Sequence, residues 1–249
     1  MVNKKHGQHI ILLFYTLGSS LVVLFIAVLW SLQLIKLPPS LIAYSRSLSF
    51  ALSFKHQTAS QLNVLFRKQE HSLSCEAAVL RMVLNYHGVE VSEDEVLEKL
   101  PFDSTRRSGN VWGEPDLGFV GDVDGKMGVD GYGVHWGPLA ITAANWKQIK
   151  IIKHGLAEDL VEHISQGRPV IIWGYLGRGR PMSWLTLEGK KVYAINGEHT
   201  FVVYGYDGPA DNPKGFLLMD PIYGPIYWDK SKLLRNWDAF GRMGLVVFE

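Results

Sequence analysis

Cys75 is the single cysteine of this 249-residue chain and the side chain best suited to covalent chemistry. It stands at the start of a predicted helix, where unpaired backbone N–H groups and the helix dipole favour a thiolate and lower its pKa. A lone cysteine cannot form a disulfide within the chain. The alternative to a reactive thiol is a small apolar side chain buried in the core.

A thiol nucleophile needs a base, and the base needs a group that orients it. His199 is the predicted base, because it opens an apolar strand just after the sequence INGE, which is expected to form a flexible turn. Asp220 ends the next long strand, and neighbouring strand ends can bring a carboxylate to an imidazole. Gln69, six residues before Cys75, is the predicted side-chain donor to an oxyanion. Each of these residues alone also fits a structural role. The hypothesis therefore rests on their occurrence together in the order Gln69, Cys75, His199 and Asp220.

Three helices are predicted ahead of most of the strands. The first is CEAAVLRMVLNY, with Ser74 as its N-cap and Gly88 as its stop. The second begins at Ser92, which has capping-box spacing to Glu95. The third is LAEDLVEHISQG, which ends at Gly167. The first of these helices begins at Cys75.

β-Branched and aromatic runs between Gly, Pro and Asp turns predict the strands. These are residues 169–175, 191–195, 199–207, 215–220, 225–228 and 244–249. The Gly-rich stretch GYLGRGRP between two of them is predicted to be a hairpin with Arg178 and Arg180 in solvent. Helices followed by strands indicate an α+β domain of two layers.

Residues 103–150 are rich in Gly, Trp and Asp and show little periodicity. They are predicted to form a long structured loop region, and long loops in compact domains often carry function. Its aromatic residues either line a groove for an extended peptide or close the core beneath the loop. These are Trp112, Phe119, Tyr132 and Trp136.

Residues 10–35 are free of charged side chains and predict a transmembrane helix. At about 1.5 Å per residue the helix is roughly 39 Å long, enough to cross a hydrocarbon core of about 30 Å. The segment is too long for a signal-peptide apolar region. Residues 1–9 form a short tail, 36–60 a Ser-rich linker and 61–249 the globular domain. We expect a single-pass membrane protein whose domain lies outside the cytoplasm.

Several motifs resemble the bacteriocin-processing, double-glycine peptidase-like family, in particular its stand-alone members. KQEHSLSCEAAVLRMVLNYHG is similar to the nucleophile motif of that family, GEHTFVVYGYD to its histidine strand and FLLMDPIYG to its aspartate strand. GRPVIIWGYLG resembles its buried central strand, and GEPDLGFVGDVDG with GYGVHWGPL resembles a loop block. The resemblance covers roughly residues 62–228.

The resemblance implies a bacterial protein with the papain-like cysteine peptidase fold, in which helices pack on an antiparallel sheet. It assigns Cys75, His199 and Asp220 to a catalytic triad and Gln69 to the oxyanion hole. The implied reaction cleaves an amide through a thioester. This chain departs from the transporter-linked members, because it has no ATP-binding signature and has Glu76 after the nucleophile. That carboxylate either opposes thiolate formation or faces solvent.

No metal site and no cofactor are predicted. Cys75 and His71 lack the further ligands of a zinc set, and the acidic loop around Asp122, Asp124 and Asp130 lacks the EF-hand pattern. A net charge of +1 argues against nucleic-acid binding. The predicted partners are a peptide or protein substrate and the membrane. Two rival hypotheses are an acyltransferase, transpeptidase or cell-wall amidase that uses the same thiol, and a non-catalytic peptide-binding module.

Overall fold

The computed structural model describes residues 58–249. The predicted membrane-spanning segment, 10–35, and the predicted linker up to residue 57 lie outside the described residues. No helix within the described part of the chain is long and apolar enough to span a bilayer.

An antiparallel sheet of seven strands forms the centre of the described fold, in the order β5-β10-β6-β7-β8-β9, with β1 also paired to β7. Its strands are β1 (Thr58–Gln61), β5 (Gln148–Ile152), β6 (Val170–Leu185), β7 (Lys191–Asp207), β8 (Gly215–Asp220), β9 (Gly224–Asp229) and β10 (Gly244–Phe248). Every pairing in this sheet is antiparallel. The predicted antiparallel sheet is therefore confirmed, and β1 includes residues assigned to the linker.

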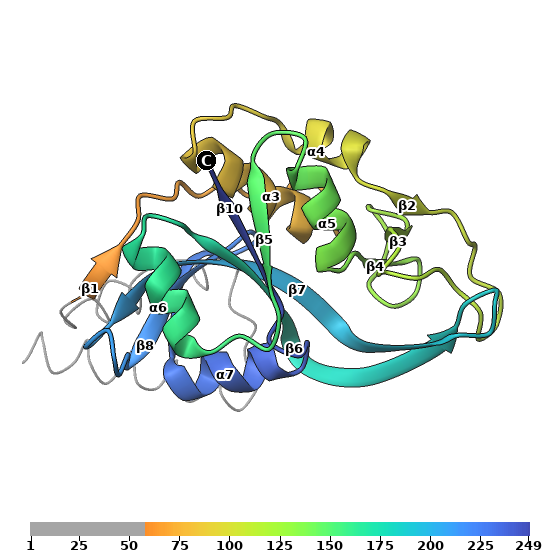
Figure 1. Cartoon of the computed structure of the whole chain (residues 1–249). Coiled ribbons are helices and arrows are strands. Elements are labelled where there is room, and N and C mark those ends of the chain that lie inside the picture. Colours follow the sequence, from red (N-terminus) through yellow and green to blue (C-terminus); the bar gives the residue numbers. More distant parts are fainter. Residues whose placement is uncertain (1–57) are drawn as a thin grey trace, which may run out of the picture. The chain divides into compact units, whose positions relative to one another are not determined.

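Helices cover both faces of this sheet (Figure 1). One face carries α3 (Cys75–Tyr86), α4 (Glu93–Lys99) and α5 (Trp136–Ala143), and the other carries α6 (Ala157–Ser165) and α7 (Lys230–Asp238). The predicted packing of N-terminal helices on an antiparallel sheet is confirmed for the first face, but the predicted two layers are wrong, because α6 and α7 form a third layer on the other face.

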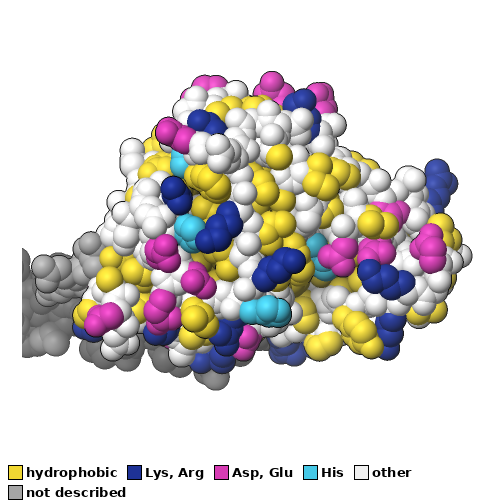
Figure 2. All heavy atoms as spheres, viewed as in Figure 1, with side chains coloured by type: hydrophobic (Ala, Val, Ile, Leu, Met, Phe, Trp, Pro, Cys, Tyr) yellow, Lys and Arg dark blue, Asp and Glu magenta, His cyan; other side chains and the backbone are white. Residues whose placement is uncertain are grey.

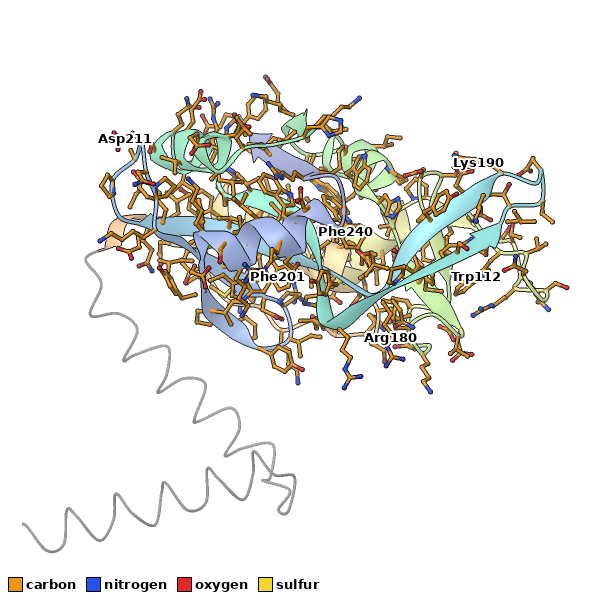
Figure 3. The ribbon with its side chains drawn as sticks, turned by 90° about the horizontal axis from the view of Figure 1, so that it is seen from below. Trp112, Arg180, Lys190, Phe201, Asp211 and Phe240 are labelled. Atoms are coloured by element: carbon orange, nitrogen blue, oxygen red, sulfur yellow. The ribbon has the colours of Figure 1, made fainter. Side chains whose placement is uncertain are left out.

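Side chains alternate between the two faces along each central strand, as the two-residue period of a strand requires. In β7, Val202 and Tyr204 pack with α3, whereas Phe201 and Val203 pack with α6 and α7. Figure 3 views the molecule from the side of α7 and labels Phe201 there. This alternation decides which β7 side chains can reach Cys75.

The predicted start of α4 and the predicted ends of α3 and α6 are confirmed. Ser92 and Glu95 form both bonds of the capping box at the start of α4. Gly88 and Gly167, which follow α3 and α6, have φ angles of 77° and 75°. A glycine adopts this left-handed conformation without the steric cost that a Cβ would impose.

Two predicted turns are absent, because β6 and β7 form one long ribbon. The sequence INGE continues β7 and pairs with β6, so the predicted flexible turn before His199 is wrong. The predicted hairpin at GYLGRGRP is an irregularity within β6, between Tyr175 and Arg180. A buried aromatic cluster explains this extension, since Trp112 and Tyr132 pack on Trp184 of the ribbon.

The 103–150 region contains more regular structure than predicted. It includes α5, β5 and parts of a small second sheet, whose strands are β2 (Phe102–Asp103), β3 (Phe119–Gly121) and β4 (Gly131–Gly133). Phe119 and Tyr132 are fully buried and close the core instead of lining a groove, whereas Trp112 is almost fully buried and also borders a pocket. Helix α7 was not predicted either.

Candidate active site

Cys75 is the first residue of α3, and only 4% of it is exposed. Its thiol donates to Oε2 of Glu76, with an Sγ–Oε2 distance of 3.2 Å. Ser74 precedes the helix but makes no side-chain cap. Its hydroxyl donates to Glu93 instead. The thiol thus meets a carboxyl group at the helix start.

A second carboxyl reaches the thiol from β7. Glu198 is 3% exposed, and Cys75, Glu76 and Glu198 each place a polar atom within 4.8 Å of the other two. Thr200 lies on the same face of β7, and its buried hydroxyl faces the sulfur. One thiol and two carboxyl groups therefore share one buried site.

The end of β4 lies against the two carboxyl groups of this site. The Val134 N–H donates to Oε1 of Glu76 at 2.7 Å, and the Val134 carbonyl accepts from the Trp173 indole at 3.0 Å. Gly133 has a φ of 127°, and a Cβ there would overlap Glu76 and lie 2.7 Å from Oε2 of Glu198. Only glycine allows the backbone to approach the two carboxyl groups this closely.

These surroundings oppose ionisation of the thiol. Burial raises the pKa of Cys75 well above its ordinary value, and the negative charges of Glu76 and Glu198 raise it further. The Thr200 hydroxyl acts in the opposite direction. The thiol pKa predicted from the helix start is therefore wrong in direction. Glu76 is fully buried, so the alternative that it faces solvent is wrong.

Burial also favours the neutral form of both carboxyl groups. It raises the pKa of Glu76 from 4.5 to about 7, although the Val134 N–H lowers it in part. Burial raises the pKa of Glu198 well above its usual value, and the charge of Glu76 adds to that effect. Near neutral pH the two carboxyl groups together therefore retain protons that solvent-exposed glutamates lose.

This proton uptake predicts that the protein is more stable in mild acid. Between about pH 4.5 and pH 7 the folded chain binds a proton at Glu76 that the unfolded chain has lost. The free energy of unfolding should therefore fall as the pH rises through this range, by roughly 3 kcal/mol for such a shift. Urea unfolding at pH 5, 6, 7 and 8 measures the slope.

The matched variants for this prediction are Glu76→Gln and, as control, Glu188→Gln in the exposed turn between β6 and β7. Glu76→Gln should flatten the pH dependence, whereas Glu188→Gln should leave it unchanged. Equal slopes in the wild-type chain and Glu76→Gln would show that Glu76 is ionised alike in the folded and unfolded states.

The structure brings His199 and Asp220 together. The distance from Nε2 of His199 to Oδ1 of Asp220 is 3.2 Å, and both side chains are buried. The same Oδ1 accepts from the N–H groups of Ile222 at 2.8 Å and Tyr223 at 3.1 Å. The His199 ring also packs edge-on against Phe201, at 4.9 Å between ring centroids. Asp220 therefore orders the turn after β8 as well as holding the histidine.

His199 and Cys75 lie on different faces of the sheet. His199 alternates with Glu198 and Thr200 along β7 and shares its face with Phe201, in the α6 and α7 core. Its partner in β6 is Gly174, and a Cβ placed on Gly174 would point at the side chain of Asn236 in α7. The sheet thus separates the predicted base from the predicted nucleophile, and Glu198 takes the place beside the thiol.

Gln69 is engaged within its own loop. Its side-chain amide donates to the carbonyl oxygens of His71 at 2.7 Å and Ser72 at 3.1 Å. Its backbone N–H donates to Pro221 at 2.9 Å, which ties the loop before α3 to the residue after Asp220. In this arrangement the amide is not directed at the thiol.

One sulfur and two carboxylate oxygens also form a donor set that a divalent cation such as zinc can use. His71, four residues before Cys75, does not join this set and instead contacts Asp124 at 3.0 Å and Asp94 at 3.2 Å.

Sequence reasoning missed Glu198 and Thr200. The available signal was their position on either side of His199, because neighbours in a strand face opposite ways. The mistaken turn at INGE hid this signal, since it removed Glu198 from the strand.

A separate pocket of about 760 Å³ lies beside the small sheet. Its lining combines aromatic and aliphatic groups with charges, and includes Phe102, Arg106, Arg107, Trp112, Asp122 and Val129. The backbone around it connects to the loop before α3, because Leu73 N–H donates to the Val123 carbonyl at 2.8 Å.

A family model matches residues 61–245, and its description is the Peptidase C39-like family. The uncharacterized protein YvpB of Bacillus subtilis is 26% identical over 177 residues, which cover 70% of this chain and 68% of YvpB. The crystal structure of a C39-like protein from Bacillus anthracis has a TM-score of 0.66 at 24% identity, over 78% of this chain and 98% of that one.

Proposed function

This chain belongs to the Peptidase C39-like family, and from that membership we propose that it is a thiol peptidase with Cys75 as the nucleophile. The reaction is attack of the Cys75 sulfur on a peptide carbonyl, release of the amine and hydrolysis of the resulting thioester. The observation that carries the proposal is the position of Cys75 as the first residue of helix α3.

Two groups are alternatives for the acceptor of the Cys75 proton. His199, oriented by Asp220, is one proton acceptor, and a carboxyl group beside the thiol is the other. Position on the sheet favours the carboxyl group, since Glu198 shares the face of Cys75 and His199 does not. If Gln69 supplies the oxyanion donor, its amide must leave the loop carbonyl groups that it now contacts.

A peptide or protein is the proposed substrate. The pocket beside the small sheet offers apolar and charged groups for an extended chain. Figure 2 shows basic and acidic side chains intermixed over the viewed face, unlike the basic face of a nucleic-acid-binding protein. Because only 4% of Cys75 is exposed, substrate entry requires a rearrangement that exposes the sulfur.

We also propose that residues 10–35 anchor the protein in a membrane, with the peptidase domain outside the cytoplasm. The uncharged length of this segment supports the anchor. We expect a reporter fused after Glu249 to be active when that reporter works only outside the cytoplasm. Activity of a cytoplasm-specific reporter at that position would contradict the orientation.

The proposed reaction is tested with the full-length chain and a mixed peptide pool in water enriched in ¹⁸O. Hydrolysis should create new peptide ends whose carboxyl groups carry the label, and mass spectrometry detects both. Added amine acceptors measure the rival reaction, because acyl transfer places the amine on the new end without ¹⁸O. Cys75→Ala is the control, and cleavage that persists in this variant would exclude Cys75 as the nucleophile.

A non-catalytic peptide-binding module is the second candidate function. Burial of Cys75 and the raised pKa of its thiol favour it. Under this alternative the wild-type chain and Cys75→Ala bind the same peptides with equal affinity, and neither releases products.

A further inference from the structure

We propose that His71 is a positioning residue for the proposed peptidase. Its protonated ring, held between Asp94 and Asp124, fixes the loop before α3 in a position that keeps the Gln69 amide away from Cys75. These two ring contacts are called the latch below, and loss of the ring proton opens it. The inference rests on the proposed function for its effect on cleavage, whereas the latch itself can be measured without a substrate.

Both nitrogens of the His71 ring contact carboxyl groups. Nδ1 lies 3.0 Å from Oδ1 of Asp124, in the loop between β3 and β4, and Nε2 lies 3.2 Å from Oδ1 of Asp94 in α4. An ionised carboxylate only accepts hydrogen bonds, and a neutral imidazole has a single donor nitrogen. Only the imidazolium satisfies both contacts, so the latch is closed when both ring nitrogens carry a proton.

The charges that face this ring from the neighbouring elements are mostly negative. In α4, Glu93 precedes Asp94 and adds a carboxylate whose charge also favours the imidazolium. Arg81 of α3 offsets part of this negative charge, because its guanidinium pairs with Glu93 and with Glu70. With the two aspartates in direct contact, the surroundings stabilise a positive charge on His71.

These contacts raise the pKa of His71 from its ordinary value of 6.5. The hydrogen bond with Asp124 contributes most and the one with Asp94 comes next, whereas partial burial of the ring lowers the pKa. Because the pKa is raised, the folded chain keeps the ring proton to a higher pH than the unfolded chain does. The latch is therefore fully closed below about pH 6.5 and opens as the pH rises through the raised pKa.

The backbone of His71 is the centre of the hydrogen bonds that hold Gln69. The His71 carbonyl accepts from the Gln69 side-chain amide at 2.7 Å, and the Ser72 carbonyl accepts from the same amide at 3.1 Å. The His71 N–H donates to the Ser74 hydroxyl oxygen at 3.2 Å. The ring contacts fix this backbone to α4 and to the loop before β4. They therefore also fix the acceptors that hold the amide.

The position of the Gln69 side chain leaves one of its own atoms unsatisfied. Its Oε1 is buried and has no hydrogen-bond donor within residues 58–249. A buried acceptor without a donor destabilises the arrangement that contains it. The latch thus holds the side chain in a position that the side chain would leave if the loop were free.

Two backbone hydrogen bonds hold the ends of this loop when the latch opens. The Gln69 N–H donates to the Pro221 carbonyl at 2.9 Å, and the Leu73 N–H donates to the Val123 carbonyl at 2.8 Å. Opening therefore frees only the stretch between these two anchors. The Gln69 side chain can then turn toward an oxyanion formed at Cys75, while the cysteine stays at the helix start.

Hydrogen exchange of the full-length chain tests the latch without a substrate. Mass spectrometry follows the peptide that contains residues 69–74 in the wild-type chain and in His71→Asn. At pH 5.5 this peptide should exchange about 2- to 30-fold faster in the variant, which is the range that two exposed ion pairs supply. At pH 9, where the wild-type ring has lost its proton, the two rates should agree. Equal rates at both pH values would overturn the proposal.

Cleavage of one peptide identified from the pool tests the effect on catalysis. The ratio of kcat/KM for His71→Asn to that of the wild-type chain should exceed 1 at pH 5.5 and approach 1 at pH 9. Titration of the catalytic groups, which both chains share, cancels in this ratio. A merely structural role for His71 would lower the ratio at both pH values, and that result would contradict the proposal.

The matched control is His154→Asn. His154 is exposed and has a φ angle of 52°, a conformation that asparagine tolerates. Its exchange rates and its kcat/KM should equal those of the wild-type chain at both pH values.

His71→Arg should give the reverse result, because a guanidinium stays charged at pH 9 and offers several donors to the two aspartates. We expect residues 69–74 of this variant to exchange more slowly than in the wild-type chain at pH 9, and kcat/KM to be lower there. Wild-type exchange in His71→Arg at pH 9 would count against the latch. Absence of cleavage by every chain at both pH values refutes the peptidase, whereas the expected exchange differences would still retain the latch.

Discussion

Peptide hydrolysis by the full-length chain is expected to fall by at least about 10³-fold when Cys75 is replaced by alanine. The substitution removes the atom that forms the thioester and leaves only substrate binding and polar stabilisation, which retain a small residual rate. The buried Cys75 side chain is small, and its replacement by alanine removes only the sulfur atom, so the folded structure should persist. Initial rates of cleavage of one peptide identified from the pool measure the loss.

Cys75→Ser is the companion variant, because its hydroxyl keeps the shape of the thiol but ionises less readily. We expect it to be nearly as inactive as Cys75→Ala. The thermal midpoint of both variants should stay close to that of the wild-type chain, which separates lost chemistry from lost folding. Near-normal hydrolysis by folded Cys75→Ser would argue for a nucleophile other than sulfur.

Glu93→Ala is expected to destabilise the fold by about 3–5 kcal/mol, because it removes one partner of a buried ion pair. Glu93 is fully buried and lies 3.2 Å from the Arg81 guanidinium of α3. It also accepts from the Ser74 hydroxyl and, at 2.9 Å, from the Glu70 N–H. The change leaves Arg81 with a weakened charge partner and releases the loop that leads to Cys75.

Thermal unfolding of the full-length chain measures this effect, which corresponds to a midpoint lowered by roughly 6–20 °C for a domain of this size. Glu98→Ala is the matched control on the same helix, because Glu98 is exposed. It should change the stability by less than about 0.5 kcal/mol. Equal midpoints for the two variants would show that the ion pair contributes little to stability.

Much of the framework could be predicted from short-range patterns. The capping box of Ser92 and Glu95, the glycine stops after α3 and α6, and the position of Cys75 at a helix start all follow from interactions within a few residues. The motif around Cys75 also indicated the family that the comparison with family models shows. Such signals are readable because their physical causes are local.

The extended ribbon of β6 and β7 could not be predicted in the same way. Its Gly-rich centre has the composition of a turn, yet pairing continues through it with one irregularity. Trp112 and Tyr132, distant in the sequence, pack on one side of this ribbon. Tertiary packing of these large aromatic groups therefore overrides the local preference for a turn.

The chain by itself determined that a helix-start cysteine, a histidine strand and an aspartate strand occur in one domain. Only the tertiary structure decided that Glu198 reaches Cys75 while His199 packs with Asp220 on the other face. The reason is the two-residue period of a strand, in which a step of one position moves a side chain across the sheet. Whether a residue faces one helix layer or the other depends on contacts with β6, α3 and α7, and these are set by packing across the whole domain.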